Sequence, residues 1–99
     1  MNAAIATEIL NQLGGNRFLV MTGSKNLIAT PNGLRMNLSR NKAGAKWLSI
    51  SLNSLDLYEL DFFTADKNFN IKSKAKIKNV YADQLRKTFT EITGLYTNL

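Results

Sequence analysis

Short runs of alternating apolar and polar residues constrain the fold of this chain more than any other feature. Residues 34–39 and 46–52 both alternate in this way. Successive side chains of a strand point to opposite faces, so each run predicts a strand with one buried and one solvated face. The polar link at residues 40–45 (RNKAGA) has the length of a hairpin loop, which favours antiparallel neighbours.

Further strands are predicted on both sides of this pair. Residues 55–63 and 69–80 are separated by a polar turn, and in the second run Phe69, Ile71, Ala75 and Ile77 share one predicted face. Residues 17–22 (RFLVMT) form a short apolar run between two glycine loops, which predicts a covered strand. Residues 27–30 predict a weaker strand before the turn at Pro31.

Two helices are predicted, one at each end. Residues 3–13 and 81–93 carry apolar residues at helical spacing, and Gly94 is a typical residue to end the second helix. The expected fold class is therefore α+β. It consists of an antiparallel sheet of four to five strands in meander, with one N-terminal and one C-terminal helix packed on one face. At 99 residues, the whole chain (1–99) is expected to be a single domain.

The chain contains no histidine and no cysteine. A Ser-His-Asp triad and a histidine or thiolate zinc site are therefore excluded. Glu59 and Asp61 would share a face of their strand, but solvation or cross-strand pairing is a simpler role for them than a metal site. No catalytic residue, metal or cofactor is predicted, and we expect that the protein is not an enzyme.

The first residues lack the basic segment of a signal peptide. No run approaches the ~18 apolar residues of a membrane span. These observations lead us to expect a soluble, cytoplasmic protein without a membrane partner.

The positive charge is concentrated late in the chain. The net charge is +6, and residues 67–99 hold seven Lys/Arg against two Asp/Glu. Lysine recurs at every second position of the run IKSKAKIK, at Lys72, Lys74, Lys76 and Lys78. On a regular strand these lysines would share one face, ~6.7 Å apart and spanning ~20 Å.

Two interpretations of this lysine row stay open. Lysine protects an exposed edge strand against aggregation, which needs no ligand. Alternatively, the row contacts the phosphates of a nucleic acid. Arg35, Arg40, Lys42 and Lys46 would extend the basic surface. Trp47 would either pack at an edge under a loop or helix or, if it is exposed on the same face, stack on a base. The candidate nucleic-acid-binding residues are Lys72, Lys74, Lys76, Lys78, Arg35, Lys46 and Trp47.

Three segments carry a resemblance to a known family: LGGNRFLVMTGSKNL, LRMNLSRN and YADQLRKTFTEITGLYTNL. They resemble small uncharacterised proteins of phages, plasmids and other mobile elements of bacteria, including gut bacteria of the Bacteroides type. The resemblance runs from about Leu10 to the C-terminus and does not include the lysine row. The family has no established activity, so the resemblance implies a mobile-element setting and assigns no catalytic residue.

The leading hypothesis is a non-enzymatic protein that binds nucleic acid, or an accessory protein of a phage or mobile element. The partner would be DNA or RNA. The alternative is a protein-protein interaction module that binds a host or phage protein or forms a homodimer, with the lysines serving only solubility and edge protection. The sequence does not determine the oligomeric state.

Overall fold

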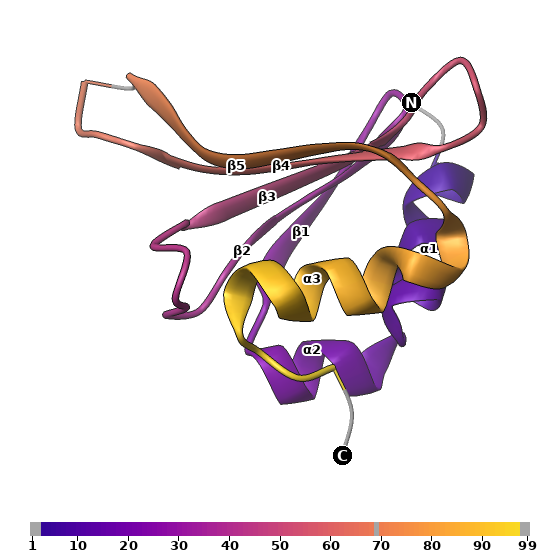
Figure 1. Cartoon of the computed structure of the whole chain (residues 1–99), viewed down its shortest axis with the longest axis horizontal. Helices are drawn as coiled ribbons and strands as arrows, with labels where there is room; N and C mark the ends of the chain where they lie inside the picture. The colour runs from indigo at the N-terminus through magenta and orange to yellow at the C-terminus, as the bar shows by residue number, and fades with distance from the viewer. Residues whose placement is uncertain (1–2, 69, 98–99) are drawn as a thin grey trace.

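The computed structural model describes residues 3–68 and 70–97. Within them the chain forms helices and strands in a simple order (Figure 1). The elements are α1 (Ala3–Leu13), α2 (Asn16–Thr22), β1 (Lys25–Thr30), β2 (Gly33–Asn37), β3 (Trp47–Leu52), β4 (Tyr58–Ala65), β5 (Ile71–Val80), the 3-10 helix η1 (Ala82–Gln84) and α3 (Leu85–Thr93).

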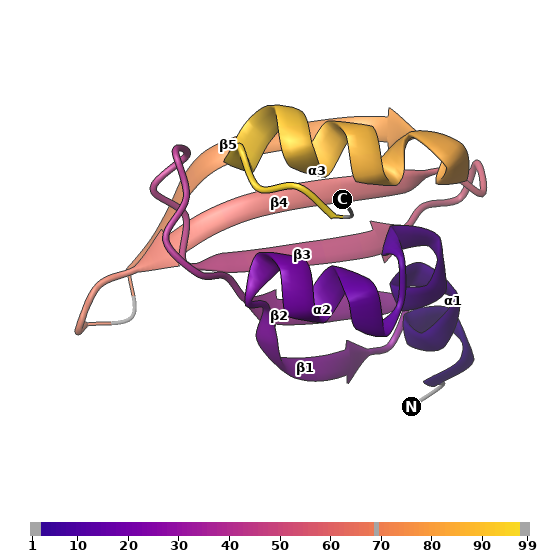
Figure 2. The same cartoon turned by 90° about the horizontal axis from the view of Figure 1, so that it is seen from below.

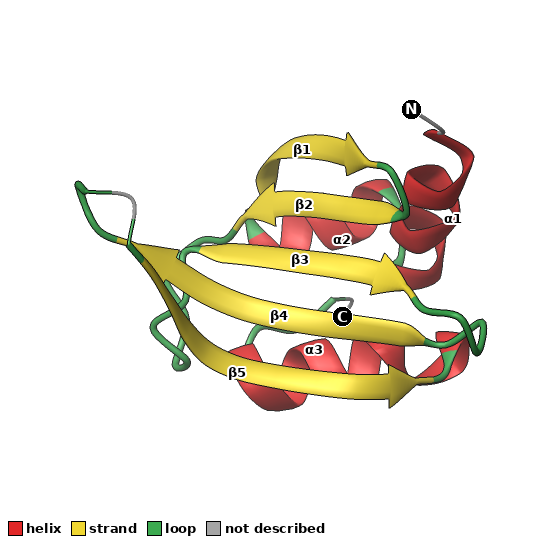
Figure 3. Ribbon diagram, turned by 90° about the horizontal axis from the view of Figure 1, so that it is seen from above, coloured by secondary structure: helices red, strands yellow, loops and turns green. Residues whose placement is uncertain are grey.

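The five strands form one antiparallel sheet in the order β1-β2-β3-β4-β5. This meander confirms the predicted α+β class. One row of paired residues crosses the whole sheet and consists of Lys25, Asn37, Trp47, Phe63 and Ser73. The starts of β1, β3 and β5 therefore lie at the same end of the sheet as the ends of β2 and β4 (Figure 3).

The core lies between the sheet and the helices. Figures 1 and 2 show all three helices on the same side of the sheet. Phe89 of α3 is fully buried, with its ring centroid 5.0 Å from that of Phe18 on α2 and 6.3 Å from that of Phe62 on β4. These three rings join two helices to the sheet. The strand residues of the same cluster are Leu34, Met36, Leu48, Ile50, Tyr58, Leu60, Phe62 and Val80.

The strand predicted at residues 17–22 is wrong, because these residues form α2. A short apolar run fits a buried strand and a buried helix equally well by its pattern. The packing of the side chains favours the helix. Phe18 and Thr22, four residues apart, are both buried on one face. The Thr22 hydroxyl donates a hydrogen bond of 2.7 Å to the Phe18 carbonyl, and Gly23 ends the helix with a φ of 70°.

The other predicted elements are present, with shifted ends. The N-terminal helix has the predicted bounds, and the weak strand at residues 27–30 is part of β1. β4 begins later than predicted, because the Asn53 side chain accepts hydrogen bonds from the amides of Leu55 and Leu57 and holds the preceding loop. The C-terminal helix begins with η1 and ends at Gly94, which has the left-handed φ of 75° expected of such a glycine.

Candidate nucleic-acid interface

The register of β5 breaks the predicted lysine row. Lys76 pairs with Asp61, whereas Lys72 pairs with Thr64. Asp61 and Thr64 are three residues apart on β4, so they lie on opposite faces of the sheet. The register shifts where Phe62 pairs with Ala75 and the next β4 residue already pairs with Ser73, which leaves one extra residue on β5. This β-bulge reverses the alternation, so the prediction of four lysines on one face is wrong.

The same bulge moves Ile71 away from the core. Ile71 was expected to share a face with Ala75 and Ile77, which pack against the core. It instead pairs with Ala65 and is 69% exposed. Phe69, which was predicted on the same face, lies outside the described residues.

Acidic residues lie next to Lys76 and Lys78, which we call the later lysines. Asp61 is directly opposite Lys76, and Glu59 lies across from residues 78–79, where a second register shift occurs. Both carboxylates face away from the helices, since they pair with Ser49 and Ser51 on β3. Lys76 and Lys78 therefore lie in a field of mixed sign, which weakens their attraction for a polyanion.

Cations gather instead at the end of the sheet that carries the β2–β3 and β4–β5 loops. Residues 25–26, 35–47, 63–68 and 70–74, which build this end, contain eight Lys/Arg and one acidic residue, Asp66. Residues 49–61, which run to the other end, contain three acidic residues and no Lys/Arg. We call the first group the basic end. Its cations are Lys25, Arg35, Arg40, Lys42, Lys46, Lys67, Lys72 and Lys74.

An aromatic pair lies at the basic end, on the face away from the helices. Trp47 and Phe63 are cross-strand partners, with ring centroids 6.4 Å apart and planes inclined by 9°. The Arg35 guanidinium carbon lies 5.9 Å from the centroid of the Phe63 ring. Phe63 is only 7% exposed, while Trp47 is half-buried. The indole is therefore held in place and still retains accessible surface.

Three hollows surround this end. The first, of about 340 Å³, has a mainly apolar lining of Arg35, Trp47, Phe63, Ala65, Asp66 and Ile71. The second, of about 500 Å³, shares Ala65, Asp66 and Ile71 with the first and adds Lys46 and Lys72. The third, of about 490 Å³, follows the β2–β3 loop and includes Lys25, Arg40 and Lys46. Cationic side chains thus border a continuous set of depressions.

The turn between β4 and β5 is organised by Asp66. Its carboxylate accepts hydrogen bonds from the amides of Asn68 and Asn70, at 2.8 and 3.0 Å, and from the Asn70 side chain at 3.2 Å. The hydrogen bond from the Asn70 amide is the main cause that lowers the pKa of Asp66 below its usual 3.8, and partial desolvation opposes it. Asp66 therefore carries its negative charge at neutral pH.

The acidic residues do not form a metal site. In the part of the chain that the structure describes, no group of three or more acidic side chains is close enough to hold a metal ion. Glu59 accepts a hydrogen bond from Asn53 and Asp61 accepts one from Ser73, while Asp66 lies in the turn after β4. Each carboxylate thus has a local structural partner.

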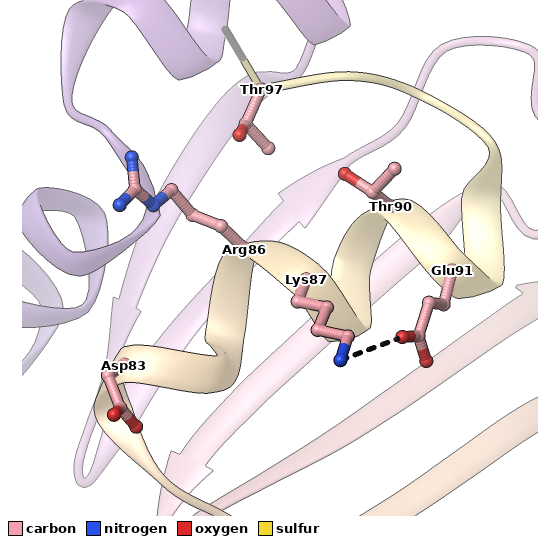
Figure 4. Close-up of a pocket in the computed structure, with 6 residues that line it drawn as sticks. All are labelled: Asp83, Arg86, Lys87, Thr90, Glu91 and Thr97. Atoms are coloured by element: carbon pink, nitrogen blue, oxygen red, sulfur yellow. Dashed lines mark ion pairs between the residues drawn. The ribbon is translucent and has the colours of Figure 1, made fainter.

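A further hollow runs along α3 (Figure 4). It has a volume of about 400 Å³ and is lined by Asp83, Arg86, Lys87, Thr90, Glu91 and Thr97. Lys87 and Glu91 form an exposed ion pair of 4.0 Å across one turn. Figure 4 shows Arg86 and Asp83 pointing in different directions. The charged groups do not converge on one point, so this hollow offers no centre for chemistry.

Five of the seven predicted site residues lie at the basic end: Arg35, Lys46, Trp47, Lys72 and Lys74. They do not share one face, because Lys72 lies on the face opposite Trp47. Lys76 and Lys78 lie beyond it, beside the carboxylates of β4. The sequence interpretation did not include Lys25, Lys67 or Phe63. Lys25 and Phe63 become neighbours of the other site residues only through strand pairing, and Lys67 lies in the turn that follows β4, so no local pattern marks them as a group.

The chain matches no protein-family model, no curated protein and no solved structure. The mobile-element setting therefore stays a prediction. Among the described residues, no helix has both the length and the apolar character needed to cross a membrane.

Proposed function

We propose that this protein binds nucleic acid through its basic end, by contacts between Lys/Arg side chains and phosphates. The observation that carries the proposal is the separation of charge along the sheet. Eight cations and one carboxylate border one end, whereas the strands that run to the other end combine three carboxylates with only two lysines, Lys76 and Lys78. A polyanion would therefore be attracted more strongly to the basic end than to the other end of the sheet.

The placement of the cations supports contact with several phosphates at once. Lys46 and Lys72 line the same hollow, and Lys25 and Arg40 line the next one, which shares Lys46. These side chains are exposed, so they remain free to follow a flexible backbone. Each phosphate that is neutralised releases condensed counterions, which provides a binding free energy that depends on salt.

Fluorescence anisotropy of a labelled single strand of ~15 nucleotides, titrated at several salt concentrations, tests this proposal. The double variant Lys46→Gln/Lys72→Gln should bind more weakly. The slope of log affinity against log salt should become shallower by about 1.4, from ~0.7 for each lost phosphate contact. No measurable binding of the unmodified protein at low salt, to this strand or to a duplex of equal length, would exclude the proposed function.

A matched control uses the two lysines outside the basic end. Lys76→Gln/Lys78→Gln removes the same net charge, from exposed positions of one strand. Because Asp61 and Glu59 lie across from these lysines, the control should leave the slope nearly unchanged. Equal effects of the two double variants would mean that net charge, and not the basic end, drives binding.

A second role concerns the later lysines alone. β5 is a sheet edge ten residues long, with exposed Lys76 and Lys78 and two register shifts. Charged side chains and bulges both hinder the pairing of an edge strand with another chain. We propose that Lys76 and Lys78 protect this edge. The interpretation of the protein as an interaction module stays an alternative, which light scattering and pull-down experiments address.

A further inference from the structure

We infer that the basic end takes a single-stranded nucleic acid, with one unpaired base lying in the hollow between Trp47, Ile71 and Arg35. This inference rests on the proposed function and names its ligand class. The hollow has a volume of about 340 Å³ and opens on the sheet face away from the helices. Its walls combine aromatic, aliphatic and cationic groups, as sites that stack single-stranded bases do.

The aromatic pair supplies a surface that is already ordered. Trp47 and Phe63 lie within 9° of parallel, and Phe63 is almost fully covered. A base that stacks on the Trp47 ring therefore orders no further aromatic side chain. Stacking of a base on an aromatic residue contributes about 1–3 kcal/mol and tolerates any base, because every base has a π face.

Arg35 and Ile71 complete the hollow on two other sides. Arg35 is held over the Phe63 ring at 5.9 Å, and its guanidinium keeps hydrogen-bond donors for a phosphate or a base edge. Ile71 is 69% exposed because the β5 bulge turns it to this face. A planar base would cover the exposed Ile71 side chain and remove apolar surface from water.

Asp66 balances the charge of Arg35 in this hollow. Asp66 lines the hollow, and its hydrogen bonds to Asn68 and Asn70 favour the ionised carboxylate. Within this hollow the carboxylate offsets the charge of Arg35, so a phosphate gains little net attraction and a neutral base meets no repulsion. Lys46 and Lys72 line the adjoining hollow, and Lys72 lies on the opposite face of the sheet from Trp47, so they would contact phosphates where the strand passes around the end of the sheet.

A duplex does not satisfy this arrangement. Its bases are stacked on each other and present only their edges, so none is free to lie flat against Trp47. A duplex would contact the cations alone. We therefore expect single strands to bind more tightly than duplexes of the same length, apart from the difference in phosphate density.

The experiment uses the intrinsic fluorescence of Trp47, which is the single tryptophan of the chain. The protein is titrated with an oligothymidine of ~10 nucleotides and with an abasic strand of equal length, which has the same phosphates and no bases. Oligothymidine should quench the emission and bind at least ~5-fold more tightly, as expected from ~1 kcal/mol of stacking. Equal affinity for both strands without quenching would overturn the inference and leave the proposed function intact. Binding of neither strand would overturn this inference, and a duplex of the same length that also fails to bind would exclude the proposed function.

Variants separate stacking from folding. Trp47→Phe should keep the preference for oligothymidine, and Trp47→Leu should lose it while affinity for the abasic strand stays unchanged. Ile71→Ser changes an exposed residue of the hollow and should also reduce the preference. The control Leu55→Ser changes a residue of similar exposure, 67%, at the other end of the sheet and should have no effect. A preference that survives both Trp47→Leu and Ile71→Ser would place the base elsewhere and overturn the inference.

Discussion

Lys76 lies directly opposite Asp61 across the β4–β5 pair. This pairing assigns the later lysines to a surface of mixed charge, although in sequence no acidic residue interrupts them. It also separates them from Lys72, which the intervening bulge places on the opposite face. The functional interpretation of the lysines therefore depends on strand register.

The edge role of the later lysines predicts self-association when they are removed. The double variant Lys76→Val/Lys78→Val leaves a ten-residue edge strand with apolar, β-branched residues and fewer charges. Such an edge pairs readily with another chain. We expect light scattering to show larger species than the unmodified protein forms at the same concentration, with the Lys76→Gln/Lys78→Gln variant between the two. A monodisperse Val variant would contradict the edge role.

The three aromatic rings of the core predict a large effect at Phe89. Phe89→Ala removes the ring that contacts both Phe18 and Phe62 and leaves a cavity in its place. It should lower the free energy of unfolding by about 3–5 kcal/mol. For a domain of this size, thermal unfolding should shift down by roughly 15 °C or more. Phe89→Leu preserves much of the volume and should cost less than ~1.5 kcal/mol. Calorimetry measures the loss of stability in each variant. Similar losses for Phe89→Ala and Phe89→Leu would argue against the proposed ring packing.

Gly33 is required for close approach of β2 to β3. A Cβ at this position would overlap the Ile50 carbonyl oxygen and contact the Ser51 Cα. Gly33→Ala should therefore lower the free energy of unfolding by about 3 kcal/mol or more, as measured by urea denaturation. Gly44→Ala is the matched control, because nothing lies within 4 Å of its added Cβ and only the left-handed φ of 70° opposes the change. It should cost ~1 kcal/mol.

The hydrogen-bonded carboxylate of Asp66 should make the stability of the fold depend on pH in acid. Its pKa is lower in the folded protein than its usual 3.8, mainly because the Asn70 amide donates a hydrogen bond to the carboxylate. The ionised group therefore stabilises the fold above its unfolded pKa, and this contribution is lost as pH falls through the folded pKa. Asp66→Asn removes the titration. Between about pH 5 and pH 2, the melting temperature of the unmodified protein should fall more than that of the variant. Parallel curves would contradict this assignment.

Much of the fold was predictable from local patterns. Alternation predicted the central strands, because one face of each is buried, and helical spacing predicted α1 and α3. Glycine at residue 94 marked a helix end that the structure confirms. The run at residues 17–22 failed because a short apolar pattern lacks the length that separates a strand from a helix. The contact of Phe18 with Phe89, far away in sequence, favours α2.

The candidate site, like the fold, was predictable only in part from the sequence. The sequence by itself determined the excess of positive charge, the absence of histidine and cysteine, and the outward direction of Trp47 from its place in an alternating strand. Only the tertiary structure decided that Phe63 lies beside Trp47, that Lys72 joins Lys46, and that Asp61 faces Lys76. The physical reason is that residue spacing sets direction only while the strand is regular. Bulges and cross-strand pairing depend on contacts between distant segments, and these contacts decide which charges become neighbours.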